Sequence, residues 1–375
     1  MIISFFHKII DMNQDIFVVG ATGKVGRELL AQVYANDVDP EAHRNPTSVV
    51  GLADSSSYLY DEEGISAEDA LRFSNREAKG ALHRGLPSLV DLLRDKKGTV
   101  HVIDVTAAQD ALGLHMGIIN DTRHSIVTAN KIPLAYSGMG TFRRLVSETQ
   151  RYGFRCSVMA GAEAVDFVRD LADVGDRPRK IEGCFSGTLG FITTGLERGV
   201  PLSSIVVEAI GRGYTEPDPA NDLDGSDVAK KILILARLSG SDVRMEDIRL
   251  SPFVSDDCLV RNDPKGLIDK LRSVDSHYSD MVGSAKERGK VLRYVARMHS
   301  MPNNARPTIS VGLEEVDRGS PLGQLSGMLN KIVVTTGTYN ENGYVVEAPG
   351  AGVRITAQNI RRDLLHQLNG RVLRL

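Results

Sequence analysis

The sequence predicts an α/β protein of two domains, in which a parallel sheet covered by helices on both faces is followed by an α+β domain. The chain has 375 residues, and a domain usually contains about 100–200 residues, so two domains are expected. Up to about residue 160, apolar strand-like segments alternate with helix-like segments, which is typical of βαβ units and a parallel sheet. Helices then dominate to about residue 240, which indicates a second domain of another class.

The elements of the first domain can be placed from these patterns. The expected strands are 16–19, 48–53, 100–105, 125–128 and 154–159, and the expected helices are 27–34, 86–95, 107–120 and 141–152. These strands are unbroken apolar runs, as in a sheet that is buried on both faces. Further on, the apolar runs 332–336 and 344–347 flank Asn340-Glu-Asn-Gly343 and predict a hairpin.

We therefore expect a first domain over residues 13–155, a second over 156–335, and a C-terminal segment over 336–375 that returns to the first domain. Met12 follows the apolar start of the chain closely, which suggests that residues 1–11 are a start-site extension. This start lacks a basic region and a small-residue cleavage site, so it does not resemble a signal peptide.

Composition excludes several classes of protein. The 45 Lys+Arg and 48 Asp+Glu residues give a net charge of −3, which argues against a basic nucleic-acid binder. No segment reaches the roughly 18 consecutive apolar residues of a membrane span. The three cysteines are too few and too scattered for a disulfide framework or a zinc site. A reducing, cytoplasmic location is expected.

Three glycines follow the first strand in Gly20-Ala-Thr-Gly-Lys-Val-Gly26. Glycine there permits a tight turn and a close approach to a pyrophosphate, and the helix N-terminus supplies free N–H donors. The spacing differs from G-x-G-x-x-G by one residue, and a tight turn without a ligand can show the same pattern. Because the strand and helix stand in the required order, we expect a Rossmann-type dinucleotide-binding domain.

Asp54 ends the second strand. An acidic residue at this place can bind the ribose 2′-OH and favours NAD over NADP. An ordinary aspartate at a strand end is an equally good interpretation. The cofactor is therefore expected to be NADP or NAD, with a mild tilt to NAD.

A proline-containing acidic loop precedes a helix in the second domain. The prolines at positions 217 and 219 exclude regular helix beside Glu216. The next helix is expected to end at Gly240. On this helix Asp227 and Lys231 are four residues apart, so their side chains share one face.

Three interpretations compete for this segment. A solvated i,i+4 ion pair is the usual fate of such residues. A calcium loop with Gly225 as its central glycine fails, because Lys231 stands where a bidentate Glu belongs. The third interpretation is a catalytic site, in which Glu216 and Asp222 lie near a helix N-terminus beside the Asp227–Lys231 pair.

The segment from Ala209 to Lys231 resembles the signature of homoserine dehydrogenases, A-x3-G-Y-T followed by D-P-x2-D-L-x-G-x-D-x3-K, without a gap. Four other segments are similar to parts of that family and occur in the same order: 128–134, 181–188, 321–330 and 350–352. The resemblance extends from about residue 15 to about residue 370.

The resemblance implies that the protein interconverts L-aspartate 4-semialdehyde and L-homoserine with NADP or NAD, in threonine and methionine biosynthesis. It implies that Lys231 exchanges a proton with the substrate oxygen, that Asp227 orients Lys231, and that Lys131 is a second candidate for the proton path. The implied substrate contacts are Glu216, which would bind the ammonium group, Asp222 and Thr188. The implied cofactor contacts are Gly20, Thr22, Gly23, Lys24, Val25, Gly26, Asp54, Thr106, Lys131, Gly213 and Gly352.

The family also implies a sodium ion, held by backbone carbonyls of the kind that Val158, Ala160 and Ala162 could supply. Arg155 and Glu163 depart from the family pattern in this segment, and an arginine beside a cation is unfavourable. A homodimer formed through the second domain is implied as well. The length of the chain suggests a monofunctional enzyme without an aspartate kinase or ACT domain.

There are two rival functions, one a related enzyme and one a non-catalytic protein. An aspartate-semialdehyde dehydrogenase shares the GATGKVG turn, but it needs a nucleophilic Cys with a paired His. Neither Cys156 nor Cys184 stands in a suitable turn. A non-catalytic NAD(P) sensor would lack the proton-transfer residues, and this chain has Glu216, Asp227 and Lys231.

Overall fold

The computed structural model describes residues 14–39, 46–301 and 306–367. The chain divides into two compact units: unit 1 extends to Gly161 and resumes at Gly352, and unit 2 is Ala162–Ala351. The suggested start-site extension, residues 1–11, lies outside the described residues. The return to the first unit begins at Gly352, later than the predicted start of the C-terminal segment at residue 336.

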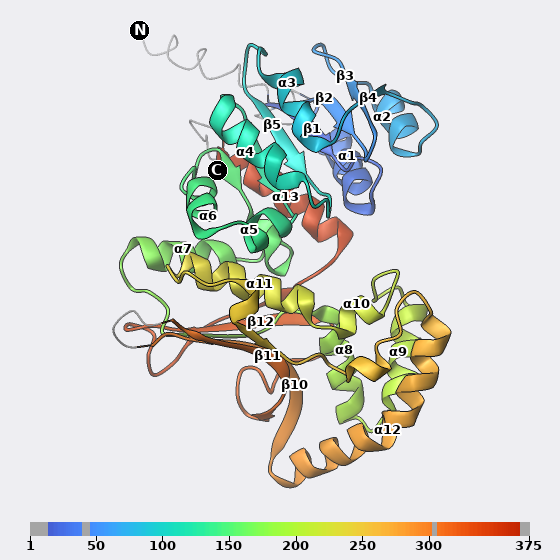
Figure 1. Cartoon of the computed structure of the whole chain (residues 1–375), viewed down its shortest axis with the longest axis vertical. Coiled ribbons are helices and arrows are strands. Elements are labelled where there is room, and N and C mark those ends of the chain that lie inside the picture. The colour runs from blue at the N-terminus through green and yellow to red at the C-terminus, as the bar shows by residue number, and fades with distance from the viewer. Residues whose placement is uncertain (1–13, 40–45, 302–305, 368–375) are drawn as a thin grey trace. The chain divides into compact units, whose positions relative to one another are not determined.

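Unit 1 contains a sheet with helices around it (Figure 1). Its strands are β1 (Gln14–Val19), β2 (Thr47–Ala53), β3 (Ser57–Tyr60), β4 (Ala81–Leu82), β5 (Val100–Asp104), β6 (Ser125–Thr128) and β7 (Tyr152–Gly153). Its α-helices are α1 (Lys24–Asn36), α2 (Ala67–Ser74), α3 (Leu89–Leu93), α4 (Ala111–Asp121), α5 (Ile132–Tyr136), α6 (Met139–Val146) and α13 (Val353–Gln367). Short 3₁₀ turns are η2 (Leu86–Ser88), η3 (Arg155–Ser157) and η4 (Met159–Gly161).

Within the described residues the strand order of unit 1 is β4-β3-β2-β1-β5-β6-β7. The five strands from β2 to β7 in this order are parallel, as predicted, and β3 and β4 add an antiparallel edge. Residues 16–19 of β1 are 0% exposed, so this strand is covered on both faces. Strand β2 lies on one side of β1 and β5 lies on the other, so the strand order reverses at β1. Ligands of open α/β sheets bind at such a switch point, at the carboxyl ends of the strands.

Two predicted elements of unit 1 were wrong. The helix expected to reach residue 152 ends at Val146, and residue 152 belongs to β7. The strand expected over 154–159 is two 3₁₀ turns, with Met159 and Ala160 at φ values of 52° and 50°. Contacts with α13 explain this, because the Asn359 Nδ2 donates to the Ala160 carbonyl at 2.8 Å.

Helix α13 joins the core of unit 1, although it comes last in the chain. Ala357, Ile360 and Leu364 belong to the same buried cluster as residues of β1 and α1. A buried ion pair adds a polar anchor, because Arg155 Nε lies 3.0 Å from Asp363 Oδ1 and these side chains are 4% and 6% exposed.

Unit 2 contains a second sheet and most of the longer helices. Its α-helices are α7 (Ala164–Asp173), α8 (Gly187–Glu197), α9 (Leu202–Gly211), α10 (Ala220–Leu223), α11 (Ser226–Leu238) and α12 (Pro264–Glu287), with 3₁₀ turns η5 (Met245–Asp247) and η6 (Asp256–Cys258). Its strands are β8 (Lys180–Cys184), β9 (Ile248–Leu250), β10 (Lys290–His299), β11 (Thr308–Asp317), β12 (Leu329–Thr335) and β13 (Tyr344–Pro349).

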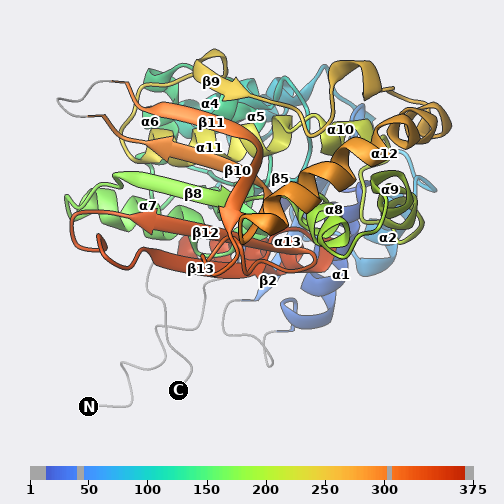
Figure 2. The ribbon, with the colours of Figure 1, turned by 90° about the horizontal axis from the view of Figure 1, so that it is seen from below.

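The described strands of unit 2 are ordered β13-β12-β8-β10-β11-β9. The pairs are antiparallel except for β9 with β11, and the predicted hairpin is confirmed as β12 and β13. One face of the sheet is apolar, and helix α11 packs against its strands β9 and β10. Figure 2 shows the strands from the other side, with α7 and α11 behind them.

That other side, which we call the outer face, carries charged side chains at partly exposed positions. Lys180 Nζ lies 2.5 Å from a carboxylate oxygen of Glu182, and Arg297 pairs with both Glu182 and Glu314. Val345 on the same face is 42% exposed. In the described part of the chain, no helix is both long enough and apolar enough to cross a membrane.

The buried ion pair of unit 1 predicts a large effect on stability. Asp363→Ala leaves the Arg155 guanidinium buried without its carboxylate, and removal of one partner of a buried pair costs about 3–5 kcal/mol. Urea denaturation followed by circular dichroism should show this loss. The double variant Arg155→Met with Asp363→Leu should recover most of it.

The exposed pair Arg94–Asp91, with side chains 51% and 71% exposed, is the matched control. Asp91→Asn should change the free energy of unfolding by about 1 kcal/mol or less. Equal effects of the two single variants would contradict the anchoring role of the buried pair.

Candidate active site

The glycine turn lies where the sequence analysis placed it, between β1 and α1. Gly20 has φ +94°, and a Cβ at Gly26 would lie 2.3 Å from the Gly20 carbonyl oxygen. Gly23 is the N-cap of α1, and its N–H donates to the Gly20 carbonyl at 3.0 Å. Thr22, Lys24 and Val25 complete the turn, so all the predicted pyrophosphate contacts belong to one loop at a helix N-terminus.

Asp54 follows β2 and shapes the turn into β3. Its Oδ1 accepts from the backbone N–H groups of Ser56 at 2.8 Å and Ser57 at 2.7 Å. Burial opposes ionisation of this carboxyl, but these hydrogen bonds outweigh it and lower the pKa of Asp54. The carboxylate therefore has a structural task in the turn, and its role toward a ribose stays a prediction.

Two loops at the ends of β5 and β6 carry further predicted residues of unit 1. The methyl group of Thr106 lies 3.0 Å from the place a Cβ would take at Gly20, so this side chain borders the glycine turn. Lys131 is the N-cap of α5. Gly352 stands just before α13, and its carbonyl accepts from the Thr356 N–H at 2.9 Å.

In unit 2 the structure brings the three predicted substrate residues together. Thr188, in the first turn of α8, lies with its hydroxyl 2.9 Å from Asp222 Oδ1 and 2.7 Å from the Tyr214 carbonyl. The other carboxylate oxygen of Asp222 accepts from the Glu216 N–H at 2.8 Å. Asp222 therefore connects α8 to the acidic loop, and the Glu216 side chain is exposed.

The environment of Asp222 changes its acidity. Burial raises the pKa of Asp222 to about 6, and the nearby carboxylates of Glu216 and Asp227 act in the same direction. Hydrogen bonds from Glu216 and Thr188 oppose this rise without cancelling it. A carboxyl group with a perturbed pKa beside other polar groups is a common feature of functional sites.

Asp227 and Lys231 form the expected pair on α11. Lys231 Nζ lies 2.8 Å from Asp227 Oδ2 and donates to the Phe185 carbonyl at 2.6 Å. The Lys231 side chain is 8% exposed and that of Asp227 is 47% exposed. The first interpretation, a solvated surface pair, is therefore wrong, because the helix buries the lysine.

Gly225 explains how the acidic loop turns into α11. This residue is the N-cap of the helix at φ +74°, and a Cβ there would lie 1.9 Å from the Tyr294 hydroxyl oxygen. Tyr294 in turn donates to the Ser251 carbonyl at 2.8 Å. A side chain at position 225 would therefore displace either the helix start or the tyrosine.

Sequence reasoning missed a residue that holds the acidic loop. Arg261 donates to Asn221 at 2.6 Å and to Asp224 at 2.9 Å. The next residue, Asn262, donates its N–H to Asp218 at 3.1 Å. A lone arginine far along the chain carries no local signal of this contact.

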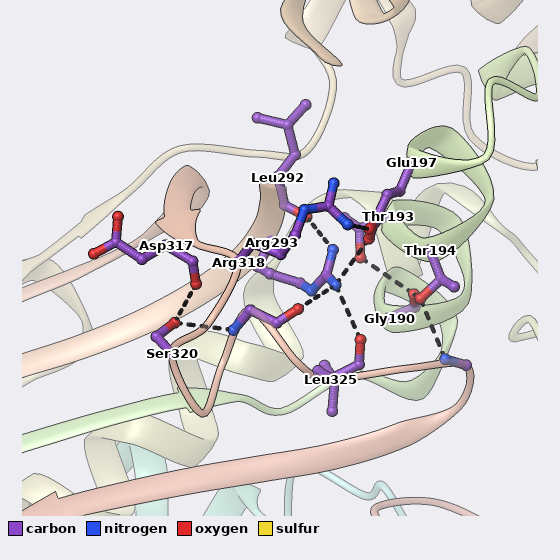
Figure 3. A network of polar contacts seen from close by, with 12 residues as sticks. Gly190, Thr193, Thr194, Glu197, Leu292, Arg293, Asp317, Arg318, Ser320 and Leu325 are labelled. Atoms are coloured by element: carbon purple, nitrogen blue, oxygen red, sulfur yellow. Dashed lines mark hydrogen bonds and ion pairs between the residues drawn. The ribbon is translucent and has the colours of Figure 1, made fainter. Parts of the chain in front are cut away.

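A second missed group fixes helix α8, as Figure 3 shows. Arg293 in β10 is 2% exposed. It donates to the carbonyls of Gly323 at 2.7 Å and Leu325 at 3.0 Å, and it pairs with Glu197 at 3.0 Å. The loop before β12 is thereby tied to α8, the helix whose first turn carries Thr188.

The three carbonyls predicted to hold sodium each accept a hydrogen bond. Ala160 accepts from the Asn359 side chain at 2.8 Å, Val158 from the Gly161 N–H at 3.3 Å, and Ala162 from the Ala164 N–H at 2.7 Å. A carbonyl oxygen has two lone pairs, so the sodium ion stays a prediction. Among the described residues, no group of three or more His, Cys, Asp or Glu is placed to hold a metal ion.

The cysteines argue against thioester chemistry. Cys156, Cys184 and Cys258 are all buried. Burial raises the pKa of Cys184 to about 12, and the thiolate is the nucleophilic form. The aspartate-semialdehyde dehydrogenase rival therefore has no suitable nucleophile at position 184.

The predicted residues thus fall into two sets. The glycine turn, Asp54, Thr106, Lys131 and Gly352 lie in unit 1. Thr188, Gly213, Glu216, Asp222, Asp227 and Lys231 lie in unit 2, where Gly213 follows α9.

Solved structures of other proteins share this fold. A Candida auris protein of unknown function matches with a TM-score of 0.80 and 25% identity, over 94% of this chain and 97% of that one. A hyperthermophilic archaeal homoserine dehydrogenase in complex with NADPH matches with a TM-score of 0.69 and 21% identity, over 94% and 97% of the two chains.

Relatives found by sequence are more similar to this chain than the solved structures are. A bifunctional aspartokinase/homoserine dehydrogenase of Zea mays is 31% identical over 350 residues, 92% of this chain and 37% of its own length. The chain thus spans less than half of such bifunctional relatives. The homoserine dehydrogenase of Saccharomyces cerevisiae is 31% identical over 293 residues, 75% of this chain and 78% of its own.

The homoserine dehydrogenase family profile matches residues 165–365. This range includes the acidic loop, α11 with Lys231, and the loop that Arg293 holds against α8. Together with the yeast relative, the match shows that the chain belongs to the homoserine dehydrogenase family.

Proposed function

We propose that the protein is a homoserine dehydrogenase that interconverts L-aspartate 4-semialdehyde and L-homoserine with NADP or NAD. The observation that carries this proposal is the Asp227–Lys231 pair, with Lys231 Nζ 2.8 Å from the carboxylate and the lysine 8% exposed. A buried cation beside a carboxylate suits proton transfer to a carbonyl oxygen. The chain also belongs to the homoserine dehydrogenase family.

The chemistry follows from the charge that develops during reduction of the aldehyde. A bound nicotinamide cofactor supplies the hydride, and the carbonyl oxygen gains negative charge as the C–H bond forms. The Lys231 ammonium stabilises that charge and donates its proton to the oxygen, which is worth roughly 10²–10⁴-fold. In homoserine oxidation, Lys231 takes the proton back.

The neighbours of Lys231 hold its amino group in one place. Asp227 and the Phe185 carbonyl both accept from Nζ, at 2.8 Å and 2.6 Å. Two fixed acceptors limit the rotation of the long side chain, which keeps the reacting proton oriented. Asp227 is half-exposed and would also meet the substrate hydroxyl.

The acidic loop supplies the other substrate contacts in this proposal. The exposed carboxylate of Glu216 would bind the ammonium group of the amino acid. Asp222 accepts from the Glu216 N–H, so it holds the backbone that presents this carboxylate. Thr188, at the start of α8, would be a further substrate contact beside Asp222.

The cofactor would bind over the glycine turn of unit 1, with Thr106 and Lys131 nearby. The archaeal relative in complex with NADPH supports an NAD(P) cofactor, and Asp54 supports a tilt to NAD. A bound sodium ion stays a prediction. A cytoplasmic location and a role in threonine and methionine biosynthesis stay predictions.

We also propose that the enzyme forms a homodimer through the outer face of the sheet of unit 2. The face combines partly buried ion pairs around Arg297 with the exposed Val345. A second copy of the chain would cover these ion pairs and Val345. In a two-fold dimer the same surface of each subunit forms the interface.

Substitution of Lys231 tests the reaction. Lys231→Ala should lower kcat for homoserine oxidation by roughly 10²–10⁴-fold, because the group that would take up the hydroxyl proton is lost. Absorbance of the reduced cofactor measures the rate with NAD and with NADP. Lys230→Ala, a change at the next residue of α11, is the control and should keep most of the activity.

Unchanged turnover of Lys231→Ala would remove this residue from the mechanism. A wild-type enzyme without activity on homoserine with either cofactor would overturn the proposed function itself.

The raised pKa of Asp222 predicts a pH dependence. Above about pH 6 the ionised carboxylate accepts from both Thr188 and Glu216, and below that pH the protonated form loses an acceptor. The kcat/KM for homoserine should therefore fall as the pH drops through about 6. Asp222→Asn should be less active and should lack this acid limb, whereas Asp218→Asn in the same loop should keep it.

Val345 tests the dimer. Val345→Arg would place a new charge in the proposed interface, so sedimentation velocity should show the variant at the 40.8 kDa of one chain and the wild type at twice that mass. Val207→Arg, at a valine that is 50% exposed on α9, should remain dimeric. A monomeric wild type would contradict the proposal.

A further inference from the structure

A fully buried carboxylate stands where β5 ends, and the mechanism above does not use it. Asp104 is the last residue of β5 and is 0% exposed. An ionised group without water needs partners for its oxygens. The partners of the Asp104 side chain come from three other segments of unit 1.

The first partner is the loop that borders the glycine turn. Asp104 Oδ1 accepts from the Thr106 backbone N–H at 2.9 Å and from the Thr106 hydroxyl at 2.7 Å. The Thr106 hydroxyl oxygen also accepts from the Ala108 N–H at 3.2 Å. Asp104 therefore fixes both the backbone and the rotamer of the residue whose methyl group lies against Gly20.

The second partner is the loop after β6. Asn130 donates its side-chain amide to Asp104 Oδ2 at 3.1 Å, and its Oδ1 accepts from the Ile132 N–H at 3.0 Å. The Ala129 N–H donates to the Asp104 backbone carbonyl at 3.0 Å. These bonds hold the residues on both sides of Lys131.

The third partner, His115, connects Asp104 to Tyr152. His115 on α4 is 0% exposed, and its Nε2 lies 3.0 Å from Asp104 Oδ2. Its Nδ1 lies 2.8 Å from the hydroxyl of Tyr152 in β7. A carboxylate needs a donor, so we assign a proton to Nε2, and we assign Nδ1 as the acceptor of the Tyr152 hydroxyl.

The state of Tyr152 agrees with this assignment. Burial, and after it the Asp104 charge, raises the pKa of Tyr152 well above its ordinary value. The tyrosine therefore keeps its proton and remains a donor at neutral pH. Each group in the chain Tyr152–His115–Asp104 thus has the hydrogen-bonding role that the next group requires.

We infer that Asp104, held by His115, is a positioning residue of the cofactor site. It sets the loop that carries Thr106 and the loop that carries Lys131 in the arrangement that receives a dinucleotide at the switch point of the sheet. This inference rests on the proposed function, since it concerns the cofactor of that reaction. Preorganised supports of this kind typically change affinity by roughly 10–100-fold when they are removed.

The test compares two substitutions of His115 in the full chain. His115→Phe keeps the ring volume but removes the donor to Asp104, so the Kd for NADPH, measured by its fluorescence, should rise roughly tenfold or more. His115→Gln can place an amide N–H near the position of Nε2. This conservative variant should bind NADPH within about threefold of wild type.

Kinetics give a second measurement. The KM for NADP should rise in His115→Phe, whereas kcat at saturating cofactor and homoserine should change far less. A general loss of folded protein would instead lower kcat and leave the KM unchanged.

His101 provides the matched control, because it is a buried histidine on the same strand, 5% exposed and hydrogen-bonded to Gln367 at 2.9 Å. It lies near the start of β5, at the opposite end of this strand from Asp104. His101→Phe should lower the melting temperature and leave the Kd for NADPH unchanged.

Three results would overturn the inference: wild-type affinity in a folded His115→Phe, no recovery in His115→Gln, or an equal loss of affinity in His101→Phe. If His115→Phe does not fold, Tyr152→Phe replaces it. This change removes only the donor to Nδ1 and should weaken NADPH binding about threefold, and unchanged affinity there would also overturn the inference. Failure of the wild type to bind NADPH or NADH would instead overturn the proposed cofactor.

Discussion

The site of unit 2 depends on one physical constraint, which is that a buried ammonium group needs acceptors. Lys231 is 8% exposed, and a charge out of water is costly unless it is paired and hydrogen-bonded. Asp227 and the Phe185 carbonyl meet that need from two different elements, α11 and the end of β8. The same contacts therefore stabilise the charge and fix its position, so the packing of α11 against the sheet decides where the ammonium group lies.

The carboxylates of Asp222 and Asp104 also need hydrogen-bond partners, because they are buried or partly buried. Asp222 is held by Thr188 from α8 and by the Glu216 backbone, and Asp104 by residues of several segments around β5. In each case a buried or partly buried carboxylate accepts hydrogen bonds from more than one segment of the chain. Both carboxylates lie beside predicted ligand contacts, which is where rigid loops matter most for function. In both units, therefore, a hydrogen-bonded carboxylate connects segments that are separate in the sequence.

Much of the fold was predictable from local patterns. The apolar runs of β1, β5 and β6, the glycine turn and the helix that bears Asp227 and Lys231 were placed within a few residues, because strand burial and helix spacing are local properties. The antiparallel edge of β3 and β4 was missed, since it depends on the turn that Asp54 caps. The segment 154–159 was predicted as a strand and forms two 3₁₀ turns, because Arg155 and Ala160 make their contacts with α13, some two hundred residues away.

The sequence by itself determined the family, the order of the elements, and which residue types stand in the acidic loop and on α11, since these are properties of spacing and residue type along the chain. Only the tertiary structure decided that Lys231 is buried while Glu216 is exposed, because burial depends on what packs against a helix from elsewhere. It also decided that Arg261, Arg293 and His115 support the candidate sites. Their contacts join segments that are distant in sequence, and such contacts leave no periodic signal in the chain.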